Sequence, residues 1–213
     1  MNVKRAICSL LIGACALASA HAGEEVVRSR AVTSDFDSRF NAGTWSLEDL
    51  VGTFFLFDRA GNTRPVMDIA INTVRLGYMV NNPALSGPLR GNVELLGEIF
   101  GGTIFNGPGD VIAGGTAFLR YNFVQPNARL VPYLQGGGGF VYSDFAHGLV
   151  GGNAVSLDVN FNLQAIGGLR FNVTRQWSVL TEISYRHISN ASTSDPNYGI
   201  DQLGGAAGVS FSF

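Results

Sequence analysis

Cysteine and lysine are almost absent from this chain of 213 residues, and both are confined to its first fifteen positions. The two cysteines are Cys8 and Cys15, and the only lysine is Lys4. The chain after residue 22 therefore has no disulfide bond to stabilise it, which is unusual for an exported protein. It also lacks any stretch of the ~20 apolar residues that a transmembrane helix needs.

Charge is also scarce, at 14% of residues. Residues 1–22 contain two of the 14 basic residues and none of the 16 acidic ones, so the remainder carries a net charge of −4. A chain of this charge has no basic surface for nucleic acid, which excludes nucleic acid as a partner. Because clusters of His and Cys are missing too, we expect no metal and no other cofactor.

The N-terminus has the three parts of a secretory signal peptide. A basic pair precedes an apolar run over residues 6–18, and small residues follow it up to Ala22. We predict that residues 1–22 are a signal peptide that is cleaved after Ala22. A lipoprotein signal that ends at Cys15 is the alternative, although the apolar run before it would be short.

Segments in which apolar and polar residues alternate recur from residue 45 to the end of the chain. Alternation places every second side chain on the same face of a strand. In 157–173, one face carries mostly Leu, Val and Phe, and the other carries mostly Asn, Asp and Gln. Turn residues such as Asn-Gly-Pro-Gly at 106–109 separate the segments. The expected strands cover about 47–58, 64–80, 91–105, 111–123, 131–143, 157–173, 177–189 and 201–213.

Eight such strands predict an all-β fold, an eight-stranded antiparallel transmembrane β-barrel of the outer-membrane type over residues 45–213. Closure satisfies every backbone hydrogen-bonding group, as lipid requires. We expect residues 23–44 to be an N-terminal periplasmic extension and the protein to lie in the bacterial outer membrane. A soluble barrel with its apolar face turned inward around a ligand is the alternative.

The same alternation assigns positions to the charged residues and to the loops. Inward positions carry Glu94, Glu98, Glu182, Arg120 and Arg170, which predict a network of ion pairs in the lumen. With an even number of strands and a periplasmic N-terminus, the connections after strands one, three, five and seven are extracellular.

Three polar residues interrupt an apolar face beside the last of these connections. His187 and Ser189 lie two residues apart on one strand, and a hairpin centred on residue 195 would pair Ser189 with Asp201. All three then lie at the extracellular rim on the lipid-facing side, within reach of one another. A serine hydroxyl needs a base, and the base needs an acid, so these residue types suit a serine hydrolase. Asn190 is a candidate donor to the oxyanion. The alternative is that polar residues only mark the membrane boundary.

These residues also carry a resemblance to a known family. Residues 187–191 (HISNA) and 196–201 (PNYGID) resemble the active-site segment of the lipid A 3-O-deacylase (PagL) family, His-x-Ser-Asn-Ala, a short loop and Pro-Asn-x-Gly-Ile-acid. The spacing from serine to acid matches without a gap. The family acid is usually Glu, whereas this chain has Asp201.

The resemblance implies a serine esterase that removes the 3-O-linked acyl chain of lipid A with a triad of His187, Ser189 and Asp201. The partner would be lipopolysaccharide in the outer leaflet, and the barrel would be a monomer or a homodimer. There are two other hypotheses. One is a non-enzymatic barrel with a structural or interaction role, and the other is a lipid A acyltransferase. We expect an outward apolar wall along which the acyl chains lie, formed by Trp177, Val179, Ile183, Leu203 and Val209.

Overall fold

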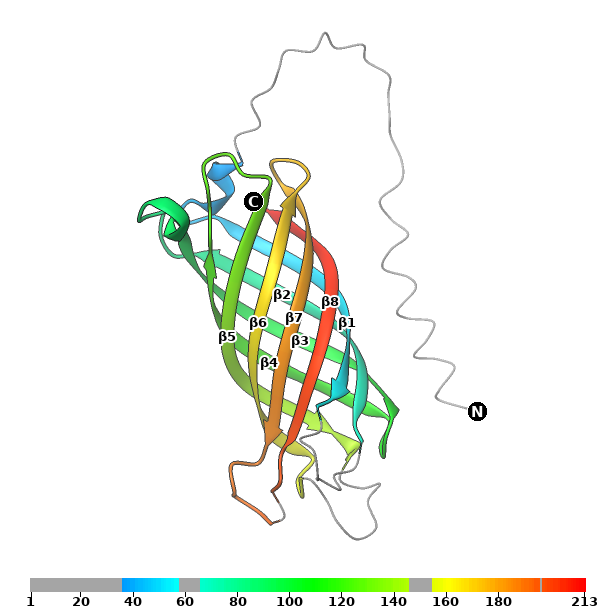
Figure 1. Cartoon of the computed structure of the whole chain (residues 1–213). Coiled ribbons are helices and arrows are strands. Elements are labelled where there is room, and N and C mark those ends of the chain that lie inside the picture. Colours follow the sequence, from blue (N-terminus) through cyan, green and yellow to red (C-terminus); the bar gives the residue numbers. More distant parts are fainter. Residues whose placement is uncertain (1–35, 58–65, 146–154, 196) are drawn as a thin grey trace, which may run out of the picture. The chain divides into compact units, whose positions relative to one another are not determined.

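The computed structural model describes residues 36–57, 66–145, 155–195 and 197–213. The described residues form eight antiparallel strands, each paired with the next, and β1 pairs with β8 to close the barrel (Figure 1). The predicted number and order of strands are confirmed. The strands are β1 (Trp45–Leu56), β2 (Asp68–Met79), β3 (Asn92–Asn106), β4 (Val111–Asn122), β5 (Leu130–Ser143), β6 (Val159–Asn172), β7 (Trp177–Ser189) and β8 (Ile200–Ser212).

Alternating burial along each strand separates an apolar exterior from a lumen that holds the charged residues together with apolar clusters. In β7, for example, outward Val179 and Ile183 are exposed while inward Ser178, Glu182 and Arg186 are buried. The apolar face points outward, so the soluble alternative, in which it lines the lumen, is excluded. None of the helices within the described residues is long and apolar enough to cross a membrane.

Aromatic side chains gather on the exterior at both ends of the strands, as in the girdles of transmembrane barrels. Pairs at the start of odd-numbered strands are Trp45–Tyr78, with ring centroids 5.0 Å apart, and Trp177–Phe211, at 4.9 Å. Pairs at the opposite end are Phe55–Phe105, at 6.0 Å, and Phe140–Phe161, at 5.3 Å. The two girdles mark the two membrane–water boundaries.

The predicted ion network fills the lumen, and the structure adds Glu48 and Arg75 to it. Arg120 donates to Glu48 at 2.6 and 2.9 Å and to Glu94 at 3.2 Å. Arg75 bonds Glu98 at 2.7 Å and Glu182 at 2.6 Å. Every one of these side chains is buried, and a barrel of eight strands has room for little more than such side chains. The lumen therefore contains a network of paired charges, and apolar clusters such as Leu96, Phe118 and Ile166 pack beside it.

Residues 36–44, the described part of the expected extension, pack against one end of the barrel. The helical turn η2 (Asp37–Phe40) buries Arg39, which donates to Asn172 at 2.6 Å and to Ser178 at 2.5 Å. Burial and the nearby positive charge of Arg170 lower the pKa of Arg39 to about 10. The expected signal peptide and the rest of the extension lie outside the described residues. A second helical turn, η3 (Gly87–Leu89), lies in the β2–β3 connection.

Candidate active site

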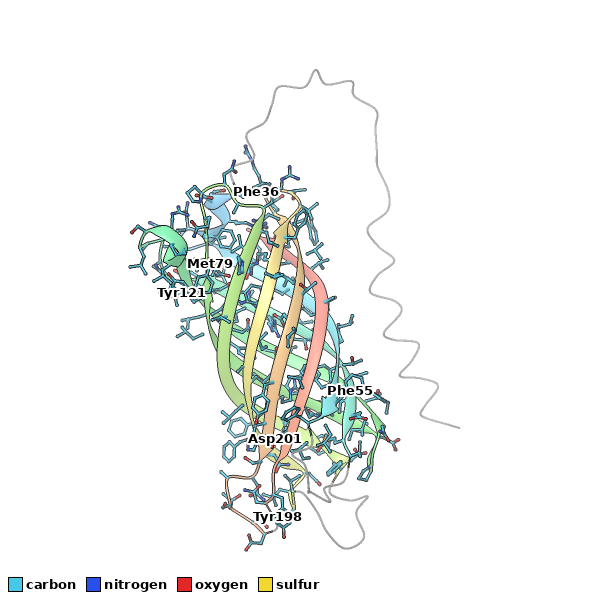
Figure 2. The ribbon with its side chains drawn as sticks, viewed as in Figure 1. Phe36, Phe55, Met79, Tyr121, Tyr198 and Asp201 are labelled. Atoms are coloured by element: carbon cyan, nitrogen blue, oxygen red, sulfur yellow. The ribbon has the colours of Figure 1, made fainter. Side chains whose placement is uncertain are left out.

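The site lies where β7 ends and β8 begins. Figure 2 shows Asp201 at this end of the barrel, with Tyr198 further out in the connecting loop. His187 and Ser189 occupy outward positions of β7, and both are partly exposed. Asp201, the second residue of β8, is 9% exposed. The fold thus brings all three predicted residues to one patch on the exterior.

The register of the hairpin differs by two residues from the expected one. His187, rather than Ser189, is directly opposite Asp201, and Ile188 is opposite Ile200. The hairpin is therefore centred on residue 194 and not on 195. The connecting loop is asymmetric, with positive φ angles at Ala191 and Ser192 near its start and at Gly199 at its end. A sequence-based count that assumes a symmetric loop misses such a shift.

This register places the acid directly against the base. His187 Nδ1 lies 2.7 Å from Asp201 Oδ1, a hydrogen-bond distance typical of a charge-assisted pair. The side chains are 32% and 12% exposed, so water screens this pair less than one on an open surface. With Nδ1 donating to the carboxylate, Nε2 becomes the nitrogen that accepts a proton.

Ser189 is on the same face as His187, two residues further along β7. Two residues of strand span about 6.6 Å between Cα atoms, which side chains can bridge. No hydrogen bond joins the Ser189 hydroxyl to His187 in the part of the chain that the structure describes. Catalytic hydrogen bonds of this kind are commonly formed only when substrate is bound. The arrangement is that of an acid and a base in contact, with a hydroxyl beside them.

Tyr185 is a member of this cluster that sequence reasoning missed. Its hydroxyl donates to Asp201 Oδ1 at 2.5 Å, the same oxygen that His187 contacts. Tyr185 precedes His187 by two residues and shares its face, so the alternation that selected His187 and Ser189 could have selected it as well.

Gly199 is part of the motif that resembles the family, but the sequence gives it no role, because that role depends on close approach rather than on chemistry. Its φ angle is +69°, which favours glycine. A Cβ atom built at this position would lie 2.8 Å from His187 Cε1. Only a residue without a side chain leaves the His187 ring in its place beside Asp201.

Asn190 does not support the expected oxyanion role. Its side chain is buried, and its Nδ2 donates to Ser156 Oγ at 3.2 Å and to the Ser194 carbonyl at 2.7 Å. Both amide hydrogens are thus engaged in holding the loop. Its backbone N–H donates to Asn197 Oδ1 at 3.0 Å, so the side-chain amide of Asn197 lies beside the residue that follows Ser189.

The residues of the expected acyl-chain wall all face outward, but only two of the five are near the cluster. Ile183 and Leu203 are close to it, because Leu203 pairs with Tyr185 and Ile183 with Gly205. Trp177 lies ten residues before His187, at the other end of β7, which is about 33 Å along the strand. If the strand is tilted by about 45° from the membrane normal, the two residues are still about 23 Å apart along that normal. This separation exceeds one leaflet, which is half of a hydrocarbon core of ~30 Å. Trp177 therefore belongs to the opposite girdle, and Val179 and Val209 lie toward it.

The cluster contains one carboxylate and one imidazole. Across the described residues, no group of three or more His, Cys, Asp or Glu side chains is arranged to hold a metal ion. The side chains of the cluster offer the chemistry of a hydroxyl, an imidazole and a carboxylate at the edge of an apolar surface.

A closed barrel of eight strands with an apolar outer band, two aromatic girdles and ion pairs in its lumen defines an outer-membrane β-barrel protein. The chain belongs to the lipid A 3-O-deacylase (PagL) family, whose family model matches residues 72–210. A comparison with curated proteins gives no match.

Solved structures show the same architecture. The barrel is similar to the outer membrane enzyme PagL, with 15% identity, a TM-score of 0.53 and coverage of 76% of this chain and 98% of that chain. It is also similar to Neisserial surface protein A (NspA), with 16% identity, a TM-score of 0.55 and coverage of 80% and 99%. At these identities the likeness establishes the fold, and the family assignment comes from the family model.

Proposed function

We propose that this barrel is a serine esterase that hydrolyses the 3-O-linked acyl chain of lipid A. The observation that carries the proposal is the 2.7 Å contact between His187 Nδ1 and Asp201 Oδ1, with Ser189 on the same outward face. These residues lie within the stretch matched by the deacylase family, residues 72–210. The neighbouring barrel NspA shares the fold, so the site rather than the fold supports an activity.

The position of Ser189 fits a substrate whose ester bonds lie at the membrane boundary. Ser189 of β7 pairs with Phe161 of β6, and Phe161 packs against Phe140 in the girdle at this end. Girdles of this kind lie at the level of the lipid headgroups. The sugars of lipid A lie at that level, and its ester-linked chains run down from them. The Ser189 hydroxyl is thus at the depth where such an ester carbonyl lies.

In the proposed reaction, His187 Nε2 takes the proton of Ser189 as its Oγ attacks the ester carbonyl carbon. The tetrahedral intermediate collapses, His187 returns the proton to the departing sugar 3-oxygen, and the acyl group stays on Ser189. Water then attacks the acyl-enzyme with His187 as base, which releases the fatty acid and restores Ser189. Asp201 holds the His187 tautomer and stabilises its positive charge.

The oxyanion of this intermediate needs a hydrogen-bond donor. Asn190 has both amide hydrogens engaged. Asn197 accepts the Asn190 N–H through Oδ1, so its Nδ2 group, on the same amide carbon, also lies near the residue that follows Ser189. We assign Asn197 Nδ2 as the candidate donor.

The proposal places the site in the outer leaflet. The cluster is at the end where odd-numbered strands finish, and a periplasmic N-terminus makes that end extracellular. Ile183 and Leu203 provide apolar surface for an acyl chain on the side of the cluster that faces the middle of the barrel. Lipopolysaccharide is the proposed partner, and no cofactor takes part.

Mass spectrometry of lipid A from cells that express the chain tests the proposal. The parent should remove one 3-O-linked acyl chain, and Ser189→Ala and His187→Ala should not. Thr181→Ala, which removes another outward hydroxyl of β7, is the matched control and should behave as the parent does. An active Ser189→Ala variant contradicts the mechanism. An unchanged lipid A mass favours a non-enzymatic barrel, and a gain in mass favours an acyltransferase.

A further inference from the structure

Two side chains of β7 donate to one oxygen of Asp201. His187 is directly opposite Asp201 across β7–β8, and Tyr185 is diagonal to it, since Tyr185 pairs with Leu203. Diagonal neighbours are about 7 to 8 Å apart, within reach of a tyrosine. The Nδ1 of His187 and the hydroxyl of Tyr185 lie 2.7 and 2.5 Å from Oδ1.

An outward tyrosine near a girdle has an ordinary explanation, because its hydroxyl reaches the headgroup region while its ring stays in lipid. Tyr185 is 38% exposed, so its ring fits this description. Its hydroxyl does not, because it bonds a largely covered carboxylate at the short distance typical of O–H···O⁻ bonds. The hydroxyl is directed sideways along the barrel wall and into the site.

We propose that Tyr185 is a positioning residue, which fixes the Asp201 carboxylate so that it faces His187; this inference rests on the proposed function. A carboxylate oxygen has two lone-pair sites, and the two donors occupy both on Oδ1. Rotation about the Cβ–Cγ bond of Asp201 would break both bonds at once.

The arrangement is specific to a side chain of this length. An added methylene in Asp201→Glu would move the carboxylate by about 1.5 Å, the length of one carbon–carbon bond. With a bent side chain, the Glu carboxylate can still accept a hydrogen bond from His187. It is then out of reach of the Tyr185 hydroxyl. Tyr185 should therefore matter with Asp at this position and matter much less with Glu.

A double-mutant cycle on the purified, refolded barrel tests this, with fatty-acid release from lipid A in detergent micelles as the assay. Tyr185→Phe should lower kcat about ten-fold with KM within two-fold, the effect of one hydrogen bond to a charged group. In the Asp201→Glu background, Tyr185→Phe should lower kcat less than two-fold. Tyr142→Phe, another outward tyrosine at this end of the barrel, is the control and should leave kcat unchanged. Equal losses from Tyr185→Phe in both backgrounds overturn the proposal.

A second readout does not depend on activity. In barrel labelled with ¹⁵N-histidine, the Nδ1 proton of His187 should resonate far downfield because Asp201 accepts it, and Asp201→Asn identifies it. Tyr185→Phe should shift this proton and speed its exchange with water. A resonance that does not move overturns the positioning role. If the parent barrel releases no fatty acid, the proposed function fails, and this measurement still decides the role of Tyr185.

Discussion

His187 and Asp201 face each other directly across β7 and β8, and their side chains meet at 2.7 Å. Asp201→Asn should therefore lower kcat for lipid A deacylation by about 10³- to 10⁴-fold, as happens when the acid of a triad becomes an amide and the wrong histidine tautomer results. Fatty-acid release under saturating substrate measures the effect. Asp49→Asn, which removes another outward carboxylate far from the site, should change the rate less than two-fold. A loss below ten-fold for Asp201→Asn would mean that His187 does not need this acid.

Gly199 should be intolerant of any side chain. A Cβ at this position would lie 2.8 Å from His187 Cε1, and the φ angle of +69° adds strain for a residue other than glycine. Gly199→Ala should lower kcat at least ten-fold by displacing the imidazole, while the barrel still folds. Gly87→Ala is the matched control, because Gly87 also has a positive φ but has open space around it. Full activity in Gly199→Ala contradicts the role of close approach.

The fold could be predicted from the sequence because the strand period is two. The outward positions of 157–173 read as an apolar series, and β6 (Val159–Asn172) forms there with that face exposed. The charged residues on inward positions were recognised for the same reason. Glu48 and Arg75 were missed, although they share the inward phase of their strands.

The candidate site was predicted less completely, because it depends on a loop as well as on strands. Alternation placed His187 and Ser189 on one face, but it says nothing about the register across a loop of irregular backbone. The two-residue shift that puts Asp201 opposite His187 comes from that loop. The direction of the Asn190 side chain, and the space under the His187 ring at Gly199, are likewise set by the loop.

Stability should depend on the ion pairs of the lumen far more than on those near the surface. Arg120 is fully buried and bonds both Glu48 and Glu94, so Arg120→Met removes a cation that these two buried carboxylates share with Arg170. We expect a loss of about 3 to 5 kcal/mol in the free energy of unfolding. Arg90→Met is the matched control, because the Arg90–Asp37 pair is 24% and 29% exposed, and it should cost at most about 1 kcal/mol. Urea unfolding of the barrel in lipid vesicles measures both. Equal effects would show that the network contributes no more than surface pairs.

Asp49 is an ionisable side chain on an outward position of β1, away from His187 and Asp201 at the end of β7. It is exposed on β1, where Asn72 of β2 donates to it at 2.7 Å. A charged group on the lipid face destabilises a barrel, and acidic groups do so less than basic ones. Asp49→Leu should therefore raise the free energy of unfolding by about 1 kcal/mol in vesicles. Thr53→Leu, at a neutral outward position of the same strand, is the control and should have a smaller effect. If Asp49→Leu destabilises the barrel instead, the carboxylate must make a favourable contact in the membrane beyond Asn72, and a second copy of the barrel would be the first partner to test by cross-linking.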